Sequence, residues 1–239
     1  MRLFTGLAAG LVLVAWATAP GGAQGRGGAA DDGDRAVADG GIFASGWQGR
    51  VDAGAAKQGM TVKDARLEQK GDVLHVKTGP AITYWNPANT ASGRYTVKAT
   101  FHEPQFMNIN DHPHPYGLFV GGNDLDSDNA TFLYCAAYGD GRFIVRGFGP
   151  APFQMNGRRG GEAPSVNRAA GRGSPVTQEI AITVDEGNVS CAINGAVVAT
   201  YPKSEVVADG RLKSTDGIYG IRFAHNTEGT VSGLSVTTN

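Results

Sequence analysis

IAITVDEGNVSCAINGAVVATY, residues Ile180 to Tyr201, decides the fold class of this chain. Apolar residues alternate with smaller or polar ones in three short segments, which is the period of a half-buried strand. Asp185-Glu186-Gly187 and Asn194-Gly195 separate the segments. Asn-Gly accepts the positive φ angles that a tight hairpin needs. The stretch therefore predicts an antiparallel meander with one apolar face that a second layer must cover.

The same alternation and turn residues return along the rest of the chain. No long segment shows the period of an amphipathic helix, so helix is expected only as one turn near residues 203–207. We predict an all-β, antiparallel two-sheet β-sandwich that occupies residues 41–239 as a single domain. The expected strands cover residues 65–69, 73–77, 81–85, 94–103, 116–121, 130–138, 142–148, 217–224 and 230–237.

The first 40 residues are predicted to lie outside this domain. Residues 1–23 have the pattern of a signal peptide: Arg2, an apolar run over 3–17, then small residues up to a cleavage site after Ala23. An uncleaved anchor is the alternative, but the run is shorter than the ~20 residues of a membrane span. Residues 24–40 are mostly Gly, Ala and Asp and predict a flexible leader. We expect a secreted or periplasmic protein without a membrane span in its mature form.

Composition narrows the classes of partner. The chain has 239 residues, a formal charge of -1 and a pI near 6.5, which argues against a general polyanion binder, and no nucleic-acid partner is expected. Cys135 and Cys191 both fall in predicted strands. An exported protein permits a disulfide between them, and two buried free cysteines are the alternative.

One segment interrupts the strand pattern. Residues 149–174 are rich in Gly, Pro and Arg and form the long loop of the predicted domain. Loops of this length are usually functional or mobile. Two interpretations stay open: a mobile insertion with solubilising charge, or an ordered lip that contacts an acidic or sugar ligand.

Three short stretches carry a resemblance to a known family: Val-Ser-Cys-Ala-Ile-Asn-Gly (189–195), Gly-Ile-Tyr-Gly-Ile-Arg-Phe (217–223) and Val-Ser-Gly-Leu-Ser-Val (231–236). They resemble the concanavalin A-like lectin/glucanase superfamily. More narrowly, the chain is similar to secreted bacterial laminarinase-like and 3-keto-disaccharide-hydrolase-like domains. The resemblance implies a jelly roll whose concave sheet often faces carbohydrate. The laminarinase signature E-x-D-x-x-E is absent, and Glu103 and Glu179 are expected to be solvated carboxylates at strand edges.

Aromatic and histidine side chains supply the candidate ligand residues. Rings that stack on sugar faces are sought among Trp85, Tyr84, Tyr116, Tyr134 and Phe148, although each is also a candidate for the core. His112 and His114 flank Pro113 in an extended segment and are candidates for sugar binding, transition-metal binding or a structural role. The ligand-binding residues proposed from the sequence are Trp85, His112, His114, Tyr116, Asn123 and Arg146.

An acidic loop follows the strand that begins at Tyr116. Asp124, Asp126 and Asp128 alternate in it and offer the hard oxygen ligands that Ca²⁺ prefers, whereas a solvated turn is the alternative. The loop and the histidines lie at opposite ends of that strand. Gly117, Gly121 and Gly122 would leave room for a ligand to approach the backbone between them.

These observations favour a secreted carbohydrate-binding or surface module whose partner is an oligo- or polysaccharide. A glycoside hydrolase with an atypical acid/base pair is one alternative. A structural domain that contacts another envelope protein is the other.

Overall fold

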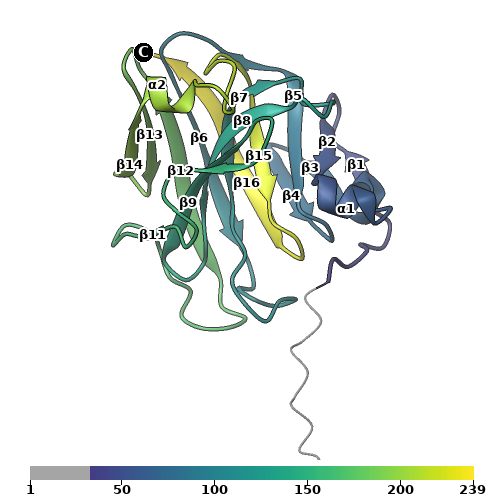
Figure 1. Cartoon of the computed structure of the whole chain (residues 1–239). Coiled ribbons are helices and arrows are strands. Elements are labelled where there is room, and N and C mark those ends of the chain that lie inside the picture. Colours follow the sequence, from purple (N-terminus) through teal and green to yellow (C-terminus); the bar gives the residue numbers. More distant parts are fainter. Residues whose placement is uncertain (1–32) are drawn as a thin grey trace, which may run out of the picture. The chain divides into compact units, whose positions relative to one another are not determined.

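Two β-sheets packed face to face make up the protein in the computed structural model, which describes residues 33–239 (Figure 1). All pairings between neighbouring strands are antiparallel except that of β1 with β3. The first sheet has the order β1 (Gly41–Phe43), β3 (Arg66–Lys70), β4 (Val73–Lys77), β16 (Glu228–Thr238), β6 (Tyr95–Glu103), β12 (Val176–Val184), β13 (Asn188–Ile193) and β14 (Ala196–Pro202).

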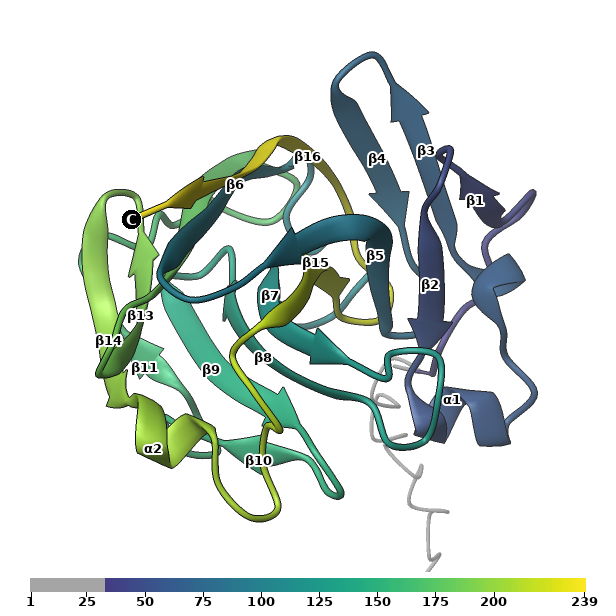
Figure 2. The same cartoon turned by 90° about the horizontal axis from the view of Figure 1, so that it is seen from above.

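The second sheet carries the surface on which the candidate site lies. Figure 2 shows its central strands side by side in one layer. Its order is β10 (Phe153–Gln154), β9 (Arg142–Phe148), β8 (Thr131–Ala137), β7 (Tyr116–Asn123), β15 (Gly217–Phe223), β5 (Ile82–Ala91) and β2 (Gln48–Val51), and β11 (Gly161–Glu162) also pairs with β9.

Helices are short and few within residues 33–239. They are α1 (Ala53–Lys57), a 3₁₀ turn at Val62–Asp64 and α2 (Lys203–Val206). The all-β sandwich predicted from the sequence is confirmed, and α2 occupies the single turn expected near residue 203. No helix in this part of the chain is long and apolar enough to cross a membrane.

The meander that decided the fold class forms as predicted. β12, β13 and β14 are consecutive and antiparallel, with Ile182 opposite Cys191. Asn194 and Gly195 have φ angles of 52° and 82°, the left-handed values that a two-residue hairpin requires. The Asn194 side chain also accepts a hydrogen bond from the Glu179 N–H (2.7 Å), so this turn ties back onto β12.

Inward-facing side chains of the two sheets meet in one apolar core. Phe101 on β6, Tyr116 on β7 and Phe223 on β15 are fully buried, and their ring centroids lie 5.8 to 6.0 Å apart. Cys135 on β8 and Cys191 on β13 form a disulfide that joins the second sheet to the first, with their Cα atoms 6.1 Å apart. Of the two alternatives left open for the cysteines, the bridge is the correct one.

The outer face of the second sheet is also buried. Along β8 every residue from Thr131 to Ala137 is buried, although alternate side chains of a strand point to opposite faces. The outward-facing set forms a second apolar cluster, which we call the outer cluster. Its members are Trp85, Phe119, Leu125, Phe132, Tyr134, Ala136 and Ile144.

Three regions show more structure than the sequence pattern indicated. β2 and α1 lie in the stretch after Gly46, where no element was predicted. Residues 33–40, from the predicted leader, are bonded to the fold: the Val37 N–H donates to the Asp64 carbonyl (3.2 Å) and the Arg35 N–H to Asn226 Oδ1 (3.1 Å). The long loop over 149–174 contains β10 and β11, both paired with β9. The predicted signal peptide and residues 24–32 lie outside the described residues.

Candidate functional site

A pocket of about 290 Å³ opens on the outer face of the second sheet. Its floor comes from β8, β9 and β15, and its wall comes from the segment 112–115 and from residues 224–225, which follow β15. Its lining holds cations, tyrosines and histidines and no carboxylate from residues 33–239. The lining residues are Ala81, His112, Pro113, His114, Pro115, Tyr134, Ala136, Tyr138, Arg142, Ile144, Arg146, Arg222, Ala224 and His225.

Strand register places the floor residues. Tyr134 on β8 is directly opposite Arg146 on β9, and Ala136 is opposite Ile144. Since paired residues of an antiparallel ladder project to the same face, these side chains line the pocket together. A Cβ at Gly117 on β7 would lie 2.0 Å from the Cys135 carbonyl oxygen. The backbone that approaches this glycine is therefore strand β8, not the ligand that the sequence suggested.

Arg222 forms the most constrained part of the floor. It is buried, donates to both carboxylate oxygens of Asp52 (2.8 and 2.5 Å), and donates to Thr83 Oγ1 (2.9 Å). Burial acts to lower the pKa of its guanidinium, but the charge and hydrogen bonds of Asp52 raise the pKa overall. Rings surround it: its Cζ lies 4.8 Å from the Phe148 centroid and 5.1 Å from that of Tyr134.

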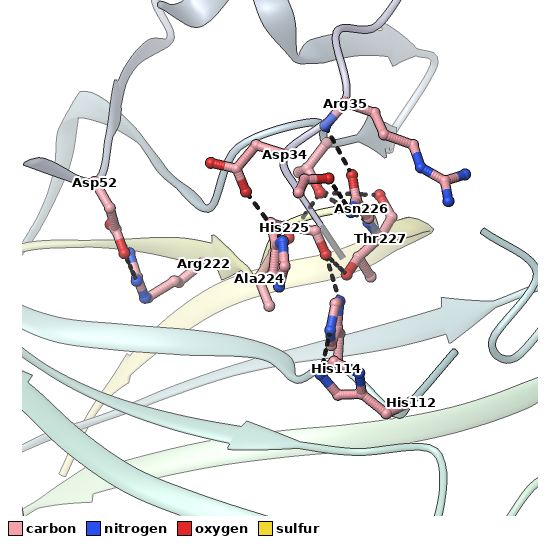
Figure 3. Close-up of polar contacts among 12 residues, drawn as sticks. Asp34, Arg35, Asp52, His112, His114, Arg222, Ala224, His225, Asn226 and Thr227 are labelled. Carbon is pink, nitrogen blue, oxygen red and sulfur yellow. Dashed lines mark hydrogen bonds and ion pairs between the residues drawn. The ribbon is translucent and has the colours of Figure 1, made fainter. Parts of the chain in front are cut away.

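Histidines make the wall opposite this arginine (Figure 3). His114 Nδ1 lies 2.6 Å from the His225 carbonyl oxygen, so it donates there and leaves Nε2 as an acceptor in the neutral ring. His112 Nε2 lies 2.9 Å from His114 Nε2, and His112 Nδ1 lies 2.7 Å from Asp111 Oδ1. His112 thus bridges Asp111 and His114 through its two ring nitrogens. The hydrogen bond from His112 lowers the pKa of Asp111.

The described start of the chain lies at this wall (Figure 3). Asp34 Oδ1 is 3.0 Å from His225 Nδ1. Asn226 holds the same segment, because its side-chain amide donates to the Gly33 carbonyl oxygen (3.1 Å). The His225 ring in turn stacks on His114 with centroids 4.2 Å apart. The wall is thus a set of packed rings held by the ion pair with Asp34 at one end and by the hydrogen bond between His112 and Asp111 at the other.

Tyr138 and Arg142 form the rim of the pocket on the side of β9. Arg142 Cζ lies 4.6 Å from the Tyr138 ring centroid, and Arg142 Nε donates to Asp140 Oδ2 (2.7 Å). Burial raises the pKa of the Tyr138 hydroxyl, while the nearby charges of Arg146 and Arg142 oppose that rise. Tyr138 is only half-buried, so one part of its ring remains available to a ligand.

The structure brings three of the six predicted ligand residues into this pocket: His112, His114 and Arg146. The predictions for Trp85 and Tyr116 are wrong because both side chains are buried. Trp85 is 3% exposed within the outer cluster, and Tyr116 is 1% exposed within the core between the sheets. Asn123 has a structural contact instead, since its amide donates to the carbonyl oxygens of Gly121 (3.1 Å) and Asp216 (3.0 Å).

The acidic loop is held by cations of the protein itself. Asp124 forms an ion pair with Lys213, and Asp128 lies 2.5 Å from an Arg50 nitrogen. In the part of the chain that the structure describes, no group of three or more His, Cys, Asp and Glu side chains is arranged to hold a metal ion. The calcium prediction for Asp124, Asp126 and Asp128 therefore receives no geometric support.

Glu103 differs from the solvated carboxylate expected at a strand edge. It is 5% exposed and faces inward at the end of β6, and burial raises its pKa to about 7. Its Oε2 lies 3.1 Å from the position that a Cβ on Gly139 would occupy, which shows how closely the chain packs around it. Glu103 does not line the pocket of the outer face.

Comparison with known proteins finds solved structures of low sequence identity. No family model matches the chain, and no curated protein matches it. Solved structures that resemble it include a galectin-like protein of unknown function from Bacillus subtilis (13% identity, TM-score 0.49, covering 80% of this chain and 89% of that one). The endo-β-1,3-glucanase of Pyrococcus furiosus is another (11% identity, TM-score 0.48, covering 81% of this chain and 89% of that one). A third is the carbohydrate-binding module CBM66 of Bacillus subtilis (9% identity, TM-score 0.47, covering 83% of this chain and 99% of that one).

The fold is an antiparallel two-sheet β-sandwich. The function has to be argued from the site, because one fold serves many functions. The site includes residues that sequence reasoning did not select: Tyr138, Arg142, Arg222 and His225. One signal was present, because Arg222 stands between Ile221 and Phe223 in an apolar strand, where a charge needs a buried partner or a ligand.

Proposed function

We propose that this protein binds carbohydrate in the pocket on the outer face of its second sheet, without cleaving it by a carboxylate mechanism. The observation that carries the proposal is the lining: hydrogen-bonding side chains and two tyrosines around about 290 Å³, with no carboxylate from residues 33–239 among them. Glycosidases of the usual kind need two carboxylates flanking the bond that breaks. Sugar binding needs ring faces and fixed polar groups, which Tyr134, Tyr138 and the arginines supply.

The rigidity of the polar groups supports binding. Asp52 and Thr83 hold Arg222, Asp140 holds Arg142, and the His225 carbonyl oxygen holds His114. Side chains that are already fixed lose little conformational entropy when a ligand arrives. With its predicted signal peptide, the protein would act as a secreted or periplasmic binding module.

The distribution of exposed apolar side chains gives no support to a protein-docking function. The large apolar residues that are exposed within 33–239 are Phe43, Val197 and Val236, and they lie on three different strands, β1, β14 and β16. An interface for a protein partner would show a contiguous apolar patch.

A glycan array followed by titration calorimetry tests the proposal. The variant Tyr138→Ala removes the half-buried ring at the rim, and Tyr201→Ala on β14 removes a half-buried tyrosine of the other sheet. Tyr138→Ala should weaken binding of a retained glycan by roughly fivefold, because ring stacking contributes on the order of 1 kcal/mol. Tyr201→Ala should leave it unchanged. Failure of the wild type to retain any glycan, or equal binding by Tyr138→Ala, would refute the proposal.

A further inference from the structure

The charges around the pocket are balanced with one exception. Two arginines and two histidines at the pocket each have a carboxylate partner. The pairs are Arg142 with Asp140, Arg222 with Asp52, His112 with Asp111 and His225 with Asp34. Arg146 lines the same pocket and forms no ion pair with a carboxylate of residues 33–239. Its positive charge is therefore the one that the described protein does not compensate.

Arg146 also has donors that remain unused. One Nη2 proton goes to the Arg158 carbonyl oxygen (2.8 Å), which fixes the direction of the guanidinium. Nε is buried from water and has no hydrogen-bond acceptor in the described chain. A guanidinium presents its donors as a planar fork that matches two oxygens of a carboxylate or a sulfate. Arg146 is thus oriented, charged and incompletely satisfied.

The surroundings favour an anion over a neutral group at this position. No carboxylate of residues 33–239 lines the pocket, so an incoming negative charge meets no repulsion from the lining. Arg142 lies on the same lining and offers further N–H donors beside the one that Asp140 accepts. Tyr134 stands directly opposite Arg146 on the neighbouring strand and offers a sugar ring a contact beside the charged group.

We propose that the ligand is an acidic carbohydrate, whose carboxylate or sulfate ester accepts hydrogen bonds from Arg146. The inference rests on the proposed function of this pocket and adds the class of sugar. The loop over 149–174 takes part through the Arg158 carbonyl oxygen, which agrees with the earlier alternative of an ordered lip. Arg146 is the residue that distinguishes acidic from neutral sugars.

Calorimetry with matched sugars tests the inference on the intact protein. Trigalacturonate is compared with its fully methyl-esterified form, which keeps the sugar skeleton and removes the charges. A sulfated galactose oligomer is compared with its desulfated form, so that the two anionic groups are distinguished. We expect at least one acid to bind tenfold or more tightly than its neutral partner, since hydrogen bonds between charged groups are the strong ones.

Three variants assign the preference to its residue. Arg146→Gln should remove the preference for the acid, because it should weaken binding of the acid by tenfold or more and binding of the neutral sugar much less. Arg146→Lys should keep part of the preference because the charge remains and the fork is lost. Arg94→Gln removes one positive charge at an exposed site on the loop before β6 and should change nothing. Melting curves of each variant serve to check that it is folded.

The outcomes separate the inference from the proposed function. If wild type binds neutral and acidic sugars equally, the inference is overturned and carbohydrate binding stands. If Arg146→Gln keeps the full preference for the acid, Arg146 is not the discriminating residue and the inference is again overturned. If no sugar of either kind binds, the proposed function itself fails. The wild-type comparison needs no substitution, so it holds even if Arg146→Gln does not fold.

Discussion

Strands β12 and β8 belong to the same sandwich but differ in burial: β12 has one buried face and β8 has two. Along β12 buried residues alternate with more exposed ones, and Thr177, Glu179, Ala181 and Thr183 face outward. Along β8 the outward-facing Phe132, Tyr134 and Ala136 are as buried as their inward-facing neighbours. A sheet that only closes a core needs one apolar face. The second covered face, with its pocket, is therefore where the function is to be sought.

Three predictions test this difference between the sheets, from the largest expected effect to the smallest. The first removes the covalent link between them. Replacing Cys135 and Cys191 together with alanine should lower the free energy of unfolding by about 4 kcal/mol, because the bridge closes a loop over a sequence separation of 56 residues. Urea denaturation measures the loss. An unchanged midpoint would mean that packing alone holds the two sheets together.

The second prediction concerns the inward carboxyl of the first sheet. Glu103 has a pKa of about 7 in the folded protein against 4.5 in the unfolded chain, so the folded state binds the proton more tightly. The stability that this group contributes is full below pH 4.5 and is lost as the pH rises to 7, by roughly 3 kcal/mol. Glu103→Gln should flatten this dependence and melt above the wild type at pH 8. A wild-type melting temperature that does not fall over this range would contradict the burial of an acid there.

The third prediction compares the two outer faces directly. Asp52→Ala leaves the buried Arg222 without its carboxylate and should cost about 2 kcal/mol, less than for a fully buried pair because Asp52 is about one-third exposed. Asp52 makes no side-chain capping bond at α1, so helix capping is not lost. Thr183→Ala on β12 removes a hydroxyl 3.0 Å from Thr96 and should cost about 0.5 kcal/mol or less.

Chemical denaturation of both variants decides the comparison. A further variant, Asp52→Ala combined with Arg222→Met, should recover part of the loss, since no uncompensated charge is then buried. Equal losses for Asp52→Ala and Thr183→Ala would show that the outer face of the second sheet is no more constrained than that of the first.

Turns and alternation explain why so much of the fold was predictable. Asn194-Gly195 and the segment before Asn188 determine the local geometry by themselves, and β4 and β9 begin and end where the pattern predicted. β2 has four residues and α1 has five, too few to show a period, and tertiary contacts define them. Strands β10 and β11 in the long loop were not predicted for the same reason, since each has two residues.

Candidate ligand residues were harder to predict because a strand pattern does not say which face is covered. Trp85 and Tyr116 are aromatic residues of the kind that stack on sugars. Trp85, however, belongs to the outer cluster together with Leu125, and Tyr116 lies in the core between the sheets. His112, His114 and Arg146 do line the pocket. Their partners come from distant segments, such as Asp52 for Arg222, and no local sequence pattern connects residues 170 positions apart.

Strand β16 separates the pocket from the end of the chain. It starts at Glu228, three residues after the histidine wall, and runs for 11 residues to Thr238, while the Asn239 N–H donates to the Arg94 carbonyl oxygen. At about 3.4 Å per residue, the last residue stands roughly 35 Å along the sandwich from His225. A tether or sensor surface coupled to Asn239 would therefore stand well away from the histidine wall of the pocket.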